Sequence, residues 1–137
     1  MVEQVIPDAG KLVEQPYRND FASWADVQEQ FQMNEPEPDE VIFADYSYED
    51  YEGWAEVLYR RGPAYFYVSG SHCSCWGLEG QWEPEAYVLA TLILATERAC
   101  DHPGRYSFLG SVAQDLLPAL RARAQASSDT AKSEGEV

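Results

Sequence analysis

The sequence predicts an α+β fold in which a three-stranded antiparallel sheet has helices packed on one face. Short runs rich in β-branched and aromatic residues recur at 40–45, 54–60 and 63–69, which is typical of strands. Runs with apolar residues three and four positions apart precede and follow them, which is typical of helices. The chain of 137 residues is 45% hydrophobic, which suits one domain with a core. We predict an N-terminal arm, a single domain and a disordered tail, over residues 1–20, 21–124 and 125–137 respectively.

The first predicted helix spans residues 21–32 and can be capped by Asn19 or Asp20. The segment that follows, 34–39, contains two prolines, so it is predicted to break the regular structure. The apolar residues of the helix form one stripe that should be buried, made of Phe21, Trp24, Val27 and Phe31.

The last two of the three predicted strands should form a hairpin. Arg61 and Gly62 separate the runs 54–60 and 63–69, and a short link containing glycine favours a tight turn. The acidic, tyrosine-rich segment 46–53 is predicted to be a connection that leads into this hairpin.

Two helices are predicted in the second half of the chain. Pro84 suits the first position of a helix, Glu85 suits the positive end of its dipole, and Trp82 can pack against Tyr87. Because residues 86–95 are apolar almost all round, the helix over 84–99 is predicted to be the buried central one. A further helix over 107–124 contains Pro118, which should kink it, and places four apolar residues near one face: Phe108, Val112, Leu116 and Leu120.

Residues 69–85 collect cysteine, histidine and tryptophan, which a plain surface loop does not usually contain. Glycine tolerates positive φ, so the glycines predict a tightly turned loop of fixed shape that positions the following helix. A shaped loop between a strand and a helix is a common place for a site. The residues predicted to give this structural loop its shape are His72, Cys73, Cys75, Gly77, Gly80 and Trp82.

A candidate zinc set consists of soft sulfur and imidazole ligands, namely Cys73, Cys75, Cys100 and His102. The C-x-C spacing is tighter than the usual C-x₂₋₄-C, and cysteines also pack as small hydrophobic residues, so the favoured prediction is no cofactor, with zinc as the alternative. His72 and Cys73 are neighbours whose side chains point to opposite sides of a strand, which is a poor arrangement for a base and a nucleophile. With so little convergent chemistry, the sequence predicts a protein that is not an enzyme.

The net charge of −15, from 24 acidic and 9 basic residues, is the strongest global signal. Direct binding to nucleic acid or to an anionic membrane requires the opposite sign. A basic protein surface is a natural partner, although acidic composition also serves solubility. The longest apolar run, 86–95, is too short to span a bilayer, the N-terminus lacks signal-peptide features, and the three cysteines are an odd number, so we expect a cytosolic protein.

The box SHCSCWGLEGQWEPE at residues 71–85 resembles the signature of a family of small phage and prophage proteins of unknown function. The upstream segment 44–53 resembles the approach to the hairpin in that family, and Trp76 departs from it where tyrosine is expected. The resemblance implies a viral or mobile-element origin, and it implies no activity. For a viral protein, the cytosol expected above is that of the host cell.

The leading hypothesis is therefore an acidic phage-encoded inhibitor that acts by protein binding. Its partner would be a host protein with a basic, nucleic-acid-binding surface, as for an anti-CRISPR or anti-restriction protein that imitates the charge of DNA. The alternative is a structural zinc-binding or thiol-bearing viral domain. Tyrosine and tryptophan anchor interfaces, so the predicted partner-binding residues are Asp45, Tyr46, Tyr48, Glu49, Asp50, Tyr51, Glu52 and Trp54, although the aromatic residues among them also suit ordinary hairpin packing.

Overall fold

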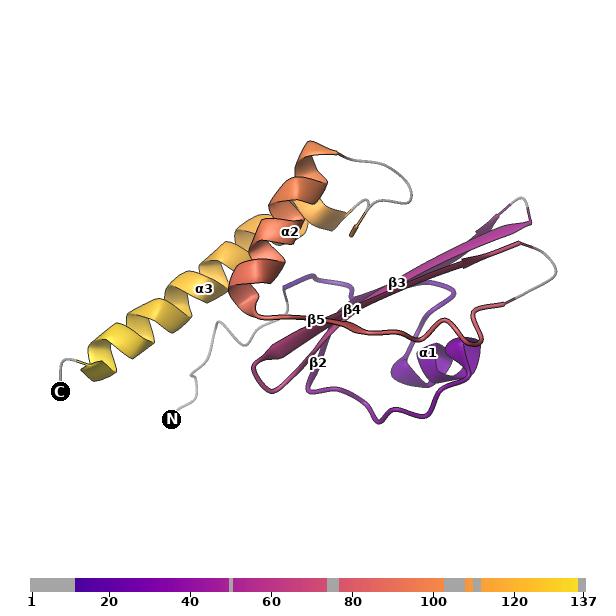
Figure 1. The fold of residues 1–137 in the computed structure, drawn as a ribbon, viewed down its shortest axis with the longest axis horizontal. Coiled ribbons are helices and arrows are strands. Elements are labelled where there is room, and N and C mark those ends of the chain that lie inside the picture. Colours follow the sequence, from indigo (N-terminus) through magenta and orange to yellow (C-terminus); the bar gives the residue numbers. More distant parts are fainter. Residues whose placement is uncertain (1–11, 50, 74–76, 103–107, 110–111, 136–137) are drawn as a thin grey trace. The chain divides into compact units, whose positions relative to one another are not determined.

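A computed structural model of the protein describes residues 12–49, 51–73, 77–102, 108–109 and 112–135 (Figure 1). These residues form two compact units, which are described separately. The sheet unit comprises residues 15–88, and the helical unit comprises the described residues up to Glu14 and from Leu89 onward. The predicted α+β class is confirmed, because helices and strands are both present.

The sheet unit contains a five-stranded mixed sheet in the order β1-β2-β3-β4-β5. Its strands are β1 (Tyr17–Asn19), β2 (Glu40–Glu49), β3 (Glu52–Arg61), β4 (Ala64–His72) and β5 (Glu85–Tyr87). β1 pairs parallel with β2, and the other neighbours pair antiparallel. The prediction of three antiparallel strands is therefore wrong in number and in type, because two three-residue strands are added at the edges by tertiary pairing.

The predicted β3–β4 hairpin is present and turns at Gly62, which has a φ of 59°. The segment 46–53, predicted to be a connection, instead belongs to a second hairpin in which β2 pairs with β3 from Glu49 opposite Glu52 to Glu40 opposite Arg60. Tyr51 lies at its turn with a φ of 68°. A bulky residue at positive φ is uncommon, so no turn signal marked this position in the sequence.

Helix α1 (Trp24–Phe31) is the predicted first helix. Ser23 caps its first turn by accepting a hydrogen bond from the backbone N–H of Asp26, and Gln32 ends it in the left-handed conformation. All four residues of the predicted stripe are buried, from Phe21 to Phe31. They pack with residues of the sheet in one apolar cluster that includes Ala44, Val57, Tyr59, Val68 and Leu78.

We define the α1 face as the sheet face that holds this cluster. Successive strand residues alternate between faces. The strand register therefore places on the α1 face, from one end to the other, Tyr48, Gly53 and His72, then Tyr46, Ala55 and Gly70, then Ala44, Val57 and Val68, and finally Tyr59 and Phe66.

The predicted helix start at Pro84 is wrong. Residues 85–87 form β5 and pair with β4, with Glu85 opposite Tyr67 and Tyr87 opposite Tyr65. The helix, α2 (Leu89–Asp101), begins only after this strand. Glu85 therefore does not lie at a helix start, and Trp82 packs against α1 and β3.

The helical unit contains α2 and α3 (Ala113–Gly135), which pack side by side (Figure 1). The prediction that the first of these is a buried helix is wrong at Leu94, which is 53% exposed. Helix α3 continues through Pro118 and reaches Gly135, so the tail predicted to be disordered from residue 125 is helical to that point. Val112, Leu116 and Leu120, three of the four residues predicted to lie near one face, are buried. Across the described residues, no helix combines the length and the hydrophobicity that crossing a membrane requires.

Candidate functional site

One end of the α1 face carries a histidine and two tyrosines from three strands. We call this the His72 end and define it by Tyr46, Tyr48, Gly53 and His72. Tyr48 on β2 lies opposite Gly53 on β3, which lies opposite His72 on β4. The His72 ring is 5.2 Å from the ring of Tyr48 and 5.8 Å from that of Tyr46, measured between centroids. Three strands thus bring together residues that are up to 26 positions apart.

His72 is held by both of its ring nitrogens. Nδ1 lies 2.7 Å from the carbonyl oxygen of Cys73, and Nε2 lies 2.6 Å from the hydroxyl of Tyr46. A carbonyl oxygen only accepts, so Nδ1 carries a proton and donates it. In the neutral ring, Nε2 then accepts a hydrogen bond from the Tyr46 hydroxyl. These two bonds fix the orientation of the imidazole.

Gly53 makes room for this arrangement. A Cβ atom at Gly53 would overlap the imidazole and come within 2.6 Å of Cε1 and 2.7 Å of Cδ2 of His72. Real Cβ atoms do not approach neighbours so closely. The missing side chain in the central strand therefore lets the His72 ring reach across β3 to the tyrosines of β2.

The loop after β4 is tied back to the sheet by one side chain. The Gln81 amide donates from Nε2 to the carbonyl oxygens of Ser71 and Gly77, and its Oε1 accepts from the N–H of Ser71. Leu78 is fully buried in the apolar cluster. The predicted fixed loop shape is supported at Gly80, which has a φ of 81°, whereas Gly77 has an ordinary φ.

Two acidic residues, Asp20 and Glu79, lie near the hydrogen bond between Tyr46 and His72. The backbone N–H of Asp20 donates to the carbonyl oxygen of Tyr46 at 2.9 Å, which places Asp20 beside that residue. Glu79 lies in the loop that Gln81 fastens next to His72. Burial raises the pKa of the Tyr46 hydroxyl, and the charges of Asp20, Tyr48 and Glu79 raise it further.

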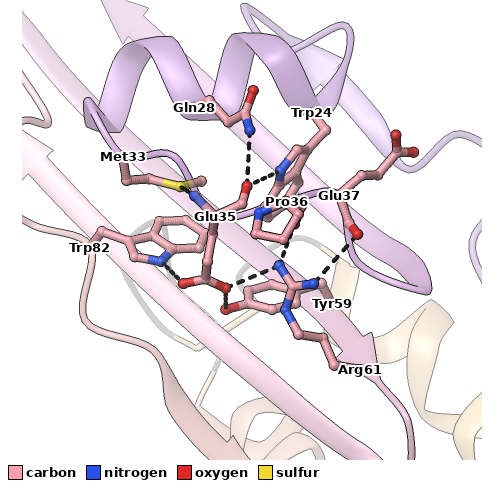
Figure 2. A network of polar contacts seen from close by, with 9 residues as sticks. All are labelled: Trp24, Gln28, Met33, Glu35, Pro36, Glu37, Tyr59, Arg61 and Trp82. Carbon is pink, nitrogen blue, oxygen red and sulfur yellow. Dashed lines mark hydrogen bonds and ion pairs between the residues drawn. The ribbon is translucent and has the colours of Figure 1, made fainter.

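At the other end of the α1 face, a second polar cluster is centred on the carboxylate of Glu35 (Figure 2). We call it the Glu35 network. Glu35 accepts hydrogen bonds from the Trp82 indole at 2.6 Å and the Tyr59 hydroxyl at 3.2 Å, and Arg61 donates to it at 3.0 Å. The Arg61 guanidinium also donates to the carbonyl oxygens of Pro36 and Glu37.

Aromatic rings surround the Glu35 network. Trp82 stacks on Tyr59 with ring centroids 5.7 Å apart and meets Trp24 edge-on at 5.8 Å. The Trp24 indole donates to the carbonyl oxygen of Glu35, as does Gln28. Burial and the neighbouring Glu35 carboxylate raise the pKa of Tyr59, with Arg61 acting in the opposite direction. The network therefore holds segment 33–37 and Trp82 onto the sheet.

Sequence reasoning missed the Glu35 network. The sequence predicts only a break around Glu35, whereas its carboxylate has partners 24, 26 and 47 residues away along the chain. Trp82 was placed among the loop residues, and the structure gives it a role there as the donor to Glu35.

The predicted partner-binding residues do not form one exposed surface, because some are exposed and others are buried. Tyr48 and Tyr51 are 44% and 75% exposed, and Glu49 and Glu52 are exposed beside them. Tyr46 is buried, Trp54 is half-buried on the opposite face, and Asp45 accepts a hydrogen bond from Asn19. Glu56, on β3 beyond these residues, is buried and accepts a hydrogen bond from the Tyr67 hydroxyl at 2.5 Å. Asp50 lies outside the described residues.

The candidate zinc residues belong to different parts of the molecule. Cys73 is an exposed free thiol in the sheet unit, while Cys100 and His102 belong to the helical unit. Cys75 lies outside the described residues, so the complete set stays a prediction. Within the described part of the chain, no group of three or more His, Cys, Asp or Glu residues is arranged to hold a metal ion.

Comparison with known proteins adds no relative. No family model, curated protein or solved structure matches the chain. The resemblance of residues 71–85 to a phage family therefore stays a prediction, and the site must be interpreted from its own geometry.

Proposed function

We propose that the protein acts by binding another protein, and that the end of the β2–β3 hairpin supplies the contact surface. The observation that supports this proposal is the pair of exposed tyrosines, Tyr48 and Tyr51, beside the exposed carboxylates Glu49 and Glu52. Tyrosine anchors interfaces because it offers a large ring together with a polar hydroxyl.

The charge indicates the kind of partner. With a net charge of −15, the protein repels anionic surfaces and attracts basic ones. A basic protein that itself binds nucleic acid meets this requirement. In that case the protein would act as an inhibitor by occupying the nucleic-acid site of its partner, as the resemblance to phage proteins suggests.

A capture experiment with matched variants tests the proposal. Wild-type protein, the variant Glu49→Gln/Glu52→Gln and the variant Tyr48→Ala/Tyr51→Ala are immobilised separately and exposed to nuclease-treated bacterial lysate. The control is Glu29→Gln/Glu83→Gln, which removes the same charge from two exposed positions outside the hairpin. The captured protein is then purified and titrated against each variant at low and high salt, with and without competing DNA.

The expected result is a basic protein that binds wild type and control alike, with binding about tenfold or more weaker for each hairpin variant. Its affinity should fall with salt and with competing DNA. Equal affinity for hairpin variants and control would reject this surface. Capture of no protein that distinguishes wild type from the hairpin variants would reject the proposed function.

A further inference from the structure

We propose that the His72 end binds the guanidinium group of an arginine from the partner, laid against the exposed Tyr48 ring, with the acidic side chains of Asp20 and Glu79 near the adjoining Tyr46. This inference rests on the proposed function, because it names the chemical group by which the partner is held. It adds residues from β1, β4 and the loop after β4 to the hairpin surface.

The first step is an accessible ring in a fixed position. Tyr48 is 44% exposed, and its inner neighbour is the His72 ring at 5.2 Å. His72 cannot rotate without losing the bonds to Cys73 and Tyr46. Tyr48 therefore rests on a rigid support and can present a face of its ring without first being ordered, which lowers the entropic cost of binding.

The second step is the charge around that ring. Asp20 follows β1 and lies beside Tyr46, and Glu79 lies in the loop fastened beside His72. Both side chains are exposed, and both raise the pKa of the Tyr46 hydroxyl, so their negative fields overlap at this place. A cation over an exposed tyrosine gains roughly 0.5–1 kcal/mol from the ring alone, and nearby carboxylates add to that attraction.

The third step is an example within the same molecule. In the Glu35 network, the Arg61 guanidinium carbon lies 5.3 Å from the centre of the Tyr59 ring while Arg61 donates to Glu35 at 3.0 Å. Its remaining N–H groups reach backbone carbonyls. That end of the α1 face thus holds its own arginine on a tyrosine beside a carboxylate. The His72 end offers a tyrosine and two carboxylates to an arginine from outside.

Arginine fits this geometry better than lysine. The guanidinium is planar, stacks on aromatic rings and has five donors in a fixed fork, whereas the lysine ammonium is a strongly hydrated point charge. A flat group can stack on the Tyr48 ring and still donate from its edges to carboxylates nearby. We therefore expect selectivity for arginine, which general attraction to an acidic protein would not produce.

The test uses two short capped peptides that differ only in their cations, one with alternating glycine and arginine and the other with alternating glycine and lysine. Each is titrated into the full-length protein, and binding is followed by NMR of the tyrosine and histidine ring resonances. The variants are Tyr48→Leu, which keeps an apolar side chain, and Asp20→Asn/Glu79→Gln. The glutamine at position 79 can still accept the hydrogen bond from the N–H of Gly77. The control Glu29→Gln/Glu83→Gln changes the net charge by the same amount.

The arginine peptide should shift the Tyr48 and His72 resonances and bind at least about threefold more tightly than the lysine peptide. Both site variants should lose about fivefold or more in affinity, while the charge-matched control should change by less than about twofold. Equal binding of the two peptides, equal loss in the control, or no binding of the arginine peptide would each overturn the inference.

The failure of this inference can be distinguished from failure of the proposed function. If a captured basic protein responds to Glu49→Gln/Glu52→Gln but not to Asp20→Asn/Glu79→Gln, the binding function stands and the arginine site is rejected. If no protein is captured through the hairpin, the proposed function itself is rejected.

Discussion

Both ends of the α1 face combine tyrosine rings with acidic residues, and the two ends use them differently. In the Glu35 network, a tyrosine, two tryptophans, a carboxylate and an arginine all satisfy one another, and Trp24 and Tyr59 are 5% and 1% exposed. At the His72 end, the imidazole is hydrogen-bonded to Tyr46 and Cys73, while the Tyr48 ring is 44% exposed. Tyr59 and Gly53 are six residues apart on β3, or about 20 Å. One end therefore has its polar groups paired with one another, and the other keeps a tyrosine ring partly exposed, where we propose that a partner binds.

This difference shows that the hydrogen-bond partners of a polar residue near aromatic rings indicate whether its role is structural or binding. Glu35 has three side-chain donors and is a structural residue. Asp20 and Glu79 are exposed near Tyr46, and the adjoining Tyr48 ring is partly open to solvent, so these carboxylates can attract a ligand. Four experiments test whether the Glu35 network is structural and the His72 end is open, in order of decreasing expected effect.

The largest expected effect is that of Trp82→Ala. This change removes the stacking on Tyr59 and the donor to Glu35, so the free energy of unfolding should fall by about 3 kcal/mol or more. The matched change Tyr48→Ala should cost less than about 1 kcal/mol, because that ring is partly exposed. Urea denaturation measures both. Similar losses at the two positions would show that the ends do not differ as described.

The second effect is that of Gly53→Ala, which should displace the His72 ring and break its bond to Tyr46. The added Cβ overlaps the imidazole, so we expect a loss of about 1–3 kcal/mol and altered His72 ring resonances. In a His72→Ala background the ring is gone and the same glycine change should cost much less. Equal costs in the two backgrounds would mean that Gly53 is not the gap that admits His72.

Much of the fold could be predicted from local pattern. The stripe Phe21 to Phe31 identified α1, because residues three and four apart share a helix face. Gly62 identified the β3–β4 turn. In both cases the determining interactions lie within a few residues of one another, which is what a local pattern can report.

The rest depends on contacts that are distant in sequence. β1 and β5 have three residues each and exist because β2 and β4 offer pairing edges. Pairing of residues 85–87 with β4 prevails over the helix-start signal of Pro84. The candidate site also depends on distant contacts, since the His72–Tyr46 hydrogen bond requires the missing side chain of Gly53 on a third strand. Only Gly80 of the loop glycines had the predicted special conformation.

The third effect compares the loop glycines through Gly80→Ala and Gly77→Ala. Gly80 has a φ of 81°, where a side chain is strained, so its replacement should cost about 1–2 kcal/mol. At Gly77 the added Cβ would meet mainly the end of the flexible Glu79 side chain, so the cost should be about 0.5 kcal/mol or less. Thermal or urea unfolding measures the difference. If Gly80→Ala leaves stability unchanged, the loop does not help to position Trp82 on the sheet.

The fourth effect is the smallest at neutral pH. It compares how ionisation of Tyr59 and of Tyr46 lowers the free energy of unfolding at alkaline pH. Burial and the Glu35 carboxylate raise the pKa of Tyr59, and burial together with the charges of Asp20, Tyr48 and Glu79 raises that of Tyr46. A hydroxyl whose pKa is raised in the folded state binds its proton more tightly there than in the unfolded chain. Its contribution is complete below the unfolded pKa of about 10 and is lost as pH rises through the folded value.

The free energy of unfolding should therefore fall as pH increases beyond about 10, and Tyr59→Phe should flatten that fall more than Tyr46→Phe, because the more enclosed hydroxyl has the larger shift. Urea denaturation over a pH series, together with tyrosinate absorbance, measures both quantities. At pH about 8 each phenylalanine variant loses only its hydrogen bond, to Glu35 or to His72, about 1 kcal/mol, so the slope with pH isolates the ionisation. A Tyr46→Phe variant that flattened the alkaline fall as much as Tyr59→Phe would mean that the His72 end is as closed as the Glu35 network, and it would leave no open ring system there for a partner to bind.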